Sequence, residues 1–279
     1  MTEQTGEYEY REFPLERAGV ALHLDRVCRA GERPKRIILL THGVTYSSHE
    51  FDIDLGDYSL VRRLARAGYA VWRLDIAGYG CSGAVEDGFA PDSDYAAEDV
   101  RAAAELIVRE SGAKTIDLLG WSWGTVTAGR FTARHPELVR RLVLYAPILT
   151  GVGEETVAEP FHRNTREHAA EDFRKLPDGS FDLDAAEPEI IERYCESCLR
   201  FDGEKSPNGG RRDICVGRGI DLIPLEKIAA PTLIVYGDRD PYLNYARIES
   251  ALSRLPEGSA LRLIPGGSHM LMLEKPYYH

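Results

Sequence analysis

The sequence predicts an α/β fold in which a mostly parallel central sheet carries helices on both faces. Short apolar runs alternate along the chain with longer segments whose apolar residues recur at helical spacing. Strands that are joined by crossover helices pair in parallel, and both faces of such a sheet are covered. The first clear run, RIILLTHG at 36–43, is continuously apolar up to Gly43, as expected for a strand buried on both faces. A chain of 279 residues suits one large α/β domain or a core with a modest insertion.

The following elements repeat this alternation. Each predicted helix has apolar residues with a 3.6-residue period and ends near a glycine or proline such as Gly68, Gly112 or Pro136. In chain order, we predict a helix at 60–70, a strand at 70–80, a helix at 95–112, a strand at 115–124, a helix at 125–137 and a strand at 140–147. A strand at 231–237, a helix at 246–255 and a strand at 259–267 complete the sheet.

The regular alternation breaks between residues 148 and 228, where the chain becomes polar and charged. Two pieces in this region have helical character, EETVAEPFHRNTREHAAEDFRKL and EPEIIERYCESCLRF. We therefore expect a core formed by 1–147 and 229–279, with 148–228 as a mainly helical cap. Ligand sites in open parallel sheets lie at the carboxyl ends of the strands, and such an insertion would roof them.

Composition restricts the class of partner. The formal net charge is −11 and no basic stripe is present, which disfavours nucleic acids and anionic membrane surfaces. The N-terminus lacks a basic stretch leading into an apolar run, and no run approaches the roughly 18 apolar residues of a membrane span. Five cysteines, an odd number, indicate reduced thiols, and Cys195-x-x-Cys198 reads as two thiols on successive helical turns. We expect a cytoplasmic protein that acts on a neutral or modestly polar small molecule without a cofactor.

Gly120-Trp121-Ser122-Trp123-Gly124 carries the strongest chemical signal. A serine with glycines at −2 and +2, between an apolar strand and a helix, is typical of a nucleophile elbow. The turn is too tight for side chains at the flanking positions. The N–H groups at the start of the following helix favour a developing negative charge.

A serine hydroxyl needs a base, and the base needs an acid that orients it. Of the eight histidines, His269 follows the last predicted strand and should lie at the same edge of the sheet as Ser122. Asp238 and Asp240 both follow the penultimate strand, and their spacing alone barely separates them.

Taken together, these motifs resemble the α/β-hydrolase superfamily over nearly the whole chain from about residue 15. The matching segments are Thr41-His42-Gly43, Asp75 with GYGCSG at 78–83, the GWSWG elbow, Gly237-Asp238-Arg239-Asp240, and Gly267-Ser268-His269 followed by LEKP at 273–276. The resemblance implies an α/β-hydrolase fold with a small helical cap, and it assigns the triad acid to Asp240.

The same resemblance implies an oxyanion hole made of the backbone N–H groups of Val44 and Trp123. His42 and Trp121 are candidate pocket residues, although tryptophans beside the serine serve packing equally well. Such proteins also carry a final helix after the segment that follows the histidine. Here the sequence ends at Tyr277-Tyr278-His279, so either the natural chain continues beyond this point or the last helix is missing.

We therefore expect a serine hydrolase that cleaves a carboxylic ester, thioester or lactone through an acyl-enzyme. A C–C bond hydrolase or a thioesterase acting on a larger metabolite is the alternative that the size of the insertion favours, and a non-catalytic receptor is a further one. His49, Glu50 and Asp52 form a possible metal cluster, but a solvated or capping loop explains them better, and we predict no metal.

Overall fold

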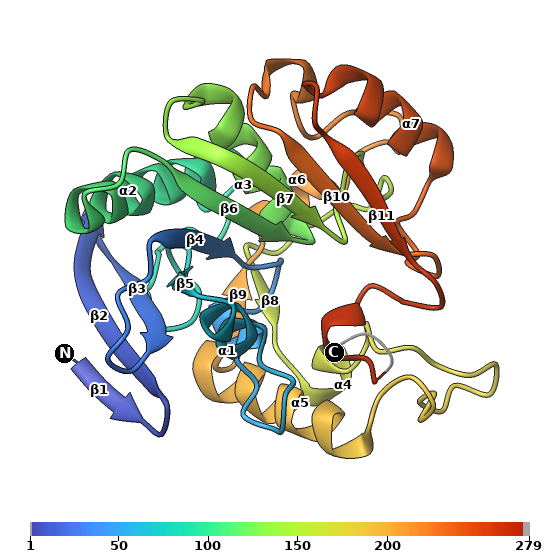
Figure 1. Ribbon diagram of the computed structural model, residues 1–279. Coiled ribbons are helices and arrows are strands. Elements are labelled where there is room, and N and C mark those ends of the chain that lie inside the picture. Colours follow the sequence, from blue (N-terminus) through green and yellow to red (C-terminus); the bar gives the residue numbers. More distant parts are fainter. Residues whose placement is uncertain (1, 276–279) are drawn as a thin grey trace.

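A mixed sheet forms the centre of the molecule in the computed structural model, which describes residues 2–275 (Figure 1). Within these residues the sheet has nine strands in the order β1-β2-β3-β5-β4-β6-β7-β10-β11. The strands are β1 (Thr2–Thr5), β2 (Tyr8–Arg17), β3 (Val20–Arg29), β4 (Arg36–Thr41), β5 (Tyr69–Leu74), β6 (Ile116–Trp121), β7 (Val139–Tyr145), β10 (Thr232–Gly237) and β11 (Ala260–Ile264). All pairs from β5 to β11 are parallel, as the alternation of strands and helices predicted.

The first three strands form an antiparallel meander that the sequence analysis did not predict. β1 pairs with β2, β2 with β3, and β3 joins the parallel part of the sheet by pairing antiparallel with β5. β1 contains no apolar residue, and polar residues interrupt the apolar ones in β2 and β3, so no continuous apolar run marks these strands. The strand at the centre, β4, is buried at five of its six positions and lies between β5 and β6.

Four helices of the core lie where the sequence indicated, with ends that differ from the predicted ones by up to four residues. They are α1 (Leu60–Arg66), α2 (Ser93–Ser111), α3 (Trp123–Arg134) and α7 (Tyr245–Arg254). The side chain of Asp92 caps α2 by accepting from the N–H groups of Asp94 and Tyr95, and Gly112 ends the helix in the left-handed conformation, with φ 70°. Ser59 and Asn244 cap α1 and α7 in the same way.

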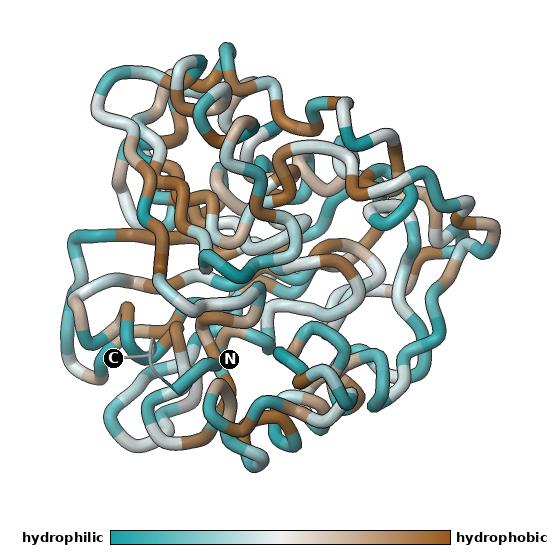
Figure 2. Tube along the Cα trace, turned by 90° about the vertical axis from the view of Figure 1, so that its right-hand side faces the viewer, coloured by the Kyte–Doolittle hydropathy of each residue, from teal (hydrophilic) through white to brown (hydrophobic). Residues whose placement is uncertain are grey.

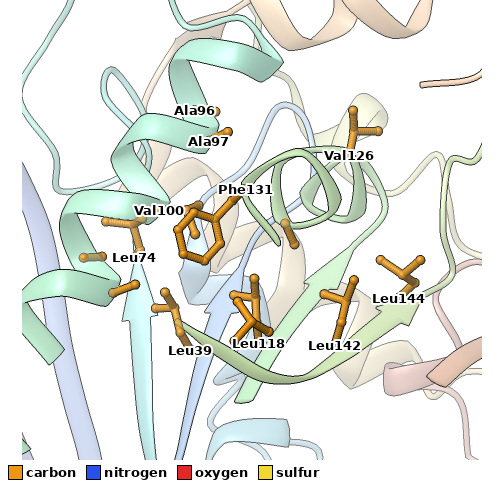
Figure 3. Close-up of a cluster of buried hydrophobic side chains, with 14 of the residues drawn as sticks. Leu39, Leu74, Ala96, Ala97, Val100, Leu118, Val126, Phe131, Leu142 and Leu144 are labelled. Carbon is orange, nitrogen blue, oxygen red and sulfur yellow. The ribbon is translucent and has the colours of Figure 1, made fainter. Parts of the chain in front are cut away.

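Apolar side chains pack against both faces of the sheet. On one face, leucines of four adjacent strands meet α2 and α3, with Phe131 of α3 fully buried between them (Figure 3). On the other face, Val61 and Ala65 of α1 and part of the cap cover Ile38 and Leu40. Hydrophobic and hydrophilic segments accordingly alternate along the trace (Figure 2).

The segment 148–228 leaves the core after β7 and returns at β10. It contains β8 (Phe161–Arg163), α4 (Arg166–Ala169), α5 (Pro188–Asp202), β9 (Lys205–Pro207), α6 (Gly209–Ile214) and the short 3-10 helix η2 (Leu225–Lys227). The prediction for EPEIIERYCESCLRF is correct, since these residues form α5 with both cysteines buried as free thiols. The prediction for the piece at 154–176 is wrong. Pro160 has no backbone N–H with which to make a helical hydrogen bond. The chain after it forms β8, which pairs with β9, and only the short helix α4 remains.

Two further expectations concern a final helix at the C-terminus and membrane-spanning helices. The last described element is the 3-10 helix η3 (Leu271–Leu273), and the two alternatives for the final helix concern a part of the chain outside the described residues. No helix within 2–275 combines the length and the apolar character that crossing a bilayer requires.

Phe131 provides a test of this packing. Its replacement by alanine should lower the free energy of unfolding by about 3–5 kcal/mol, because the ring is fully buried and its loss leaves a cavity between α3 and the sheet. The midpoint of urea denaturation measures the change. Leu176→Ala, at a side chain that is 45% exposed, is the matched control and should shift stability by no more than about 0.5 kcal/mol. Equal effects of the two substitutions would contradict the described core.

Candidate active site

Ser122 lies in a tight turn between β6 and α3. Its backbone has φ 53° and ψ −124°, a conformation that residues other than glycine rarely adopt. The two flanking glycines explain how the turn forms. A Cβ on Gly120 would lie 2.2 Å from the carbonyl oxygen of Gly124, and a Cβ on Gly124 would lie 2.2 Å from that of Thr41. The structure therefore has the steric properties of a nucleophile elbow.

Three side chains that are distant in sequence meet at this turn. The Oγ atom of Ser122 lies 2.9 Å from Nε2 of His269, and Nδ1 of His269 lies 2.9 Å from Oδ2 of Asp240. All three residues are buried. A carboxylate only accepts hydrogen bonds, so Nδ1 carries the proton and Nε2 is free to accept from the serine hydroxyl.

The geometry separates the two aspartates that the spacing left open. Asp240 also accepts a hydrogen bond from the N–H of Tyr242, at 2.9 Å, which fixes the carboxylate toward His269. Asp238 is exposed and accepts from the N–H of Gly266 at 2.6 Å, so it connects the two loops that follow β10 and β11.

The pKa of His269 is raised above its usual value of 6.5. Burial of the ring lowers this pKa, but the hydrogen bond and charge of Asp240 outweigh that effect, and the charge of Asp172 adds to it. The ring of Tyr242 packs edge-on against the imidazole, with the centroids 4.9 Å apart. His269 is thus held in one orientation and has an increased proton affinity.

Two backbone N–H groups beside Ser122 are available to a ligand. The N–H of Trp123 is the first of α3, and neither it nor the N–H of Val44 has a hydrogen-bond partner among residues 2–275. Glu50 holds the loop of Val44 in place, since its buried carboxyl group accepts from the N–H of Gly43 at 2.9 Å. This role of Glu50 could not be predicted, because nothing in the spacing shows that its side chain turns back toward Gly43.

The cap contacts the same loop. Thr45 has φ 90°, an unfavourable conformation for a β-branched residue. Its carbonyl oxygen accepts from Ser206, and its hydroxyl accepts from the guanidinium of Arg211, both at 2.5 Å. Both partners belong to the segment 148–228, so the cap stabilises the strained turn next to Val44.

A cavity of about 360 Å³ opens over Ser122 and His269. Core and cap both line it, and its walls carry ionisable groups of both signs. The lining residues are Val44, Thr45, Tyr46, Trp121, Ser122, Ile148, Val152, Gly153, Glu155, His168, Glu171, Asp172, Tyr194, Arg211, Ile214, Cys215, Tyr242 and His269. The Nε atom of Arg211 is buried and has no hydrogen-bond partner among the described residues, which leaves a donor for a ligand.

Of the two candidate pocket residues, the structure places only Trp121 at the cavity. The expectation for His42 is wrong. Its Nε2 atom accepts from the N–H of Ile76 at 3.1 Å, which turns the ring into the core and away from the cavity. Trp123 is also a packing residue, fully buried, with its indole N–H donating to Ser93.

The residues of the sequence-derived metal cluster, His49, Glu50 and Asp52, point in different directions. Glu50 binds the N–H of Gly43, whereas Asp52 accepts from Ser59 and pairs with the buried guanidinium of Arg73. They do not form a common site. Among residues 2–275, His49 lies instead near His23 and Asp75.

Known proteins that are similar to this chain include serine hydrolases and esterases. The serine hydrolase BPHL of Mus musculus is 28% identical over 255 residues, which cover 91% of this chain and 79% of that protein. A pimeloyl-[acyl-carrier protein] methyl ester esterase of Neisseria meningitidis is 26% identical, with 83% of this chain and 86% of that protein covered. Among solved structures, a thermophilic esterase from Thermogutta terrifontis has a TM-score of 0.65 at 18% identity, with 96% and 93% of the two chains covered. Residues 32–276 match the family described as serine aminopeptidase, S33, and the chain therefore belongs to this family of α/β-hydrolase enzymes.

Proposed function

We propose that this hydrolase cleaves a carboxylic ester of a small, polar molecule through an acyl-enzyme formed on Ser122. The observation that carries the proposal is the continuous chain of contacts from Ser122 to His269 to Asp240, with each separation 2.9 Å. Such contacts let a neutral imidazole remove the serine proton as the hydroxyl attacks a carbonyl carbon.

The remaining steps follow from the same groups. The N–H groups of Val44 and Trp123 stabilise the negative oxygen of the tetrahedral intermediate. A donor of this kind typically lowers the activation barrier by about 3–4 kcal/mol. The protonated His269 then gives its proton to the leaving alcohol. Water, activated by the same imidazole, releases the acid and restores the serine hydroxyl.

The cavity favours a short substrate. A volume of about 360 Å³ lies near the lower end of the range of small-molecule sites, which is roughly 300–1,000 Å³. Arg211, Glu155 and Asp172 in its wall suit polar groups and disfavour a long alkyl chain. This supports a small ester over the extended metabolite that a thioesterase or C–C bond hydrolase would take. The relative named as a methyl ester esterase supports the same bond type.

Replacement of Ser122 by alanine should abolish ester hydrolysis and labelling by a fluorophosphonate probe, because both require the activated Oγ atom. Intact-protein mass spectrometry should show one adduct on the wild type and none on Ser122→Ala. Ser253→Ala removes an exposed hydroxyl that bonds only within its own helix and should leave the adduct unchanged. A wild-type protein that takes up no probe would favour a receptor that binds without turnover.

The pH dependence of kcat/KM tests the role of Asp240. His269 acts as a base only when it is neutral, so activity should fall as the pH drops through its pKa, with a midpoint above 6.5. In Asp240→Asn the charge that raises this pKa is absent. The midpoint should move to lower pH, and kcat should fall by about 10⁴-fold.

Asp238→Asn is the control for this measurement, since Asp238 is exposed and bonds to Gly266 rather than to His269. Its pH profile should match that of the wild type. An unchanged midpoint in Asp240→Asn, or a shifted one in Asp238→Asn, would reject Asp240 as the partner of His269.

The length of the acyl chain tests the size of the cavity. With p-nitrophenyl esters, kcat/KM should be highest for acetate to butyrate and should fall at longer chains. Each methylene that no longer fits should cost about 10-fold or more. A maximum at octanoate or longer would show that the substrate extends beyond this cavity and would support the larger acyl substrates.

A further inference from the structure

A second cavity, of about 860 Å³, lies between the N-terminal strands and α5 of the cap. It has no lining residue in common with the cavity over Ser122. Its lining residues are Thr5, Tyr10, Glu12, His23, Asp25, His49, Asp52, Ile53, Asp54, Arg62, Arg73, Cys81, Arg193, Glu196, Ser197, Arg200 and Phe201. Nothing in the proposed hydrolysis uses the histidines and the thiol in this set.

Three side chains with metal-ligating atoms converge beside this cavity. His23 belongs to β3, His49 to the 3-10 helix η1 (Ser48–Phe51), and Asp75 directly follows β5. One nitrogen of each histidine and one carboxylate oxygen of Asp75 all lie within 4.8 Å of one another. The fold therefore brings together donors that the sequence separates by about 25 residues at each step.

The other contacts of these side chains leave the required atoms available. The Nε2 atom of His23 is buried and has no hydrogen-bond partner among the described residues, an unfavourable state unless a ligand satisfies it. Oδ1 of Asp75 accepts from Ser48, whereas Oδ2 accepts from the N–H of Cys81 at 2.9 Å and faces Nε2 of His49 at 3.8 Å. One further ligand on Oδ2 is compatible with these bonds.

The surroundings supply a fourth donor and fix the second imidazole. The Sγ atom of Cys81 lies 3.5 Å from Nε2 of His49. The ring of His49 stacks on that of Phe201 from α5, with an angle of 8° between the planes. Two imidazoles, a carboxylate and a thiol are ligands that Zn²⁺ takes in tetrahedral sites.

We propose that His23, His49, Asp75 and Cys81 bind one divalent transition-metal ion of the Zn²⁺ class. The nitrogen of each imidazole, Oδ2 of Asp75 and the Cys81 thiolate donate to the ion, and the thiol releases its proton to solvent as the bond to sulfur forms. Metal–ligand distances of about 2.0–2.3 Å would bring the donor atoms of His23, His49 and Asp75 closer together than their present 4.8 Å limit, and the Cys81 side chain would turn toward the ion from its contact with His49. The proposal replaces the expectation of no metal, which considered a different set of residues.

The position of the site indicates a structural role for the ion. It would connect β3, η1 and the loop after β5, which belong to separate parts of the chain. His49 also precedes Glu50, which holds the N–H of Gly43 in the loop next to the serine. Bound metal would thus restrain the loop that carries Val44 without contacting the substrate.

Calorimetric titration of the chelator-treated, full-length protein with Zn²⁺ tests the proposal. We expect one equivalent to bind to the wild type and to raise its melting temperature. His23→Gln and His49→Gln should each weaken Zn²⁺ binding by at least about 100-fold. Loss of a residue that only hydrogen-bonds to a metal ligand already lowers metal affinity by about 10- to 100-fold. His135→Gln is the control, because His135 lies at the end of α3 beside Glu137 and belongs to no such cluster.

A measurement on the wild type with Co²⁺ covers the case in which the histidine variants do not fold. Tetrahedral Co²⁺ with a thiolate ligand gives intense visible bands and a sulfur-to-metal charge-transfer band, and the latter should disappear in Cys81→Ser but persist in Cys195→Ser. No binding of Zn²⁺ at micromolar concentrations would overturn the proposal. So would binding that survives in folded His23→Gln and His49→Gln, or a charge-transfer band that depends on Cys195 instead of Cys81.

Discussion

The turn at Ser122 is the constraint on which the rest of the site depends. Gly120 lies too close to α3, and Gly124 too close to Thr41 of β4, for either to carry a Cβ, and Ser122 between them has φ 53°. Backbone strain of this kind typically costs about 1–3 kcal/mol. The burial of apolar side chains between α3 and the sheet compensates for this cost. The turn places Oγ above the carboxyl edge of the sheet and starts α3 with a free N–H at Trp123.

The cap covers this edge of the sheet and also binds the loops of the core that lie beside Ser122. Arg211 and Ser206 bind the strained Thr45, and the carboxyl group of Asp202 accepts from the backbone N–H groups of Ser47 and Gly80. Burial raises the pKa of Asp202 to about 7, with the charge of Asp75 as the next cause, and these N–H donors oppose the shift. The contact between cap and core thus includes a group that titrates near neutral pH.

The parallel part of the sheet and the triad could be predicted because their signals are local or belong to a fixed order along the chain. Three features could not. The strands β1 to β3 lack the continuous apolar runs of the central strands, because polar residues interrupt them. The helix expected at 154–176 is largely replaced by loop and by the β8–β9 pair, and His42 turns into the core. The β8–β9 pair and the orientation of His42 depend on partners far away in the sequence, which periodicity does not reveal.

The sequence by itself determined the α/β architecture, the elbow at Ser122 and the position of His269 after the last strand. These follow from apolar periodicity and from the steric need for glycine in a tight turn, which are properties of short segments. The resemblance had implied Asp240 over Asp238, and the tertiary structure placed Asp240 against His269. Only the tertiary structure gave Glu50 its contact with Gly43 and brought His23 near His49. Such choices depend on distances between side chains from separate elements, and those distances are set only when the sheet and the cap pack together.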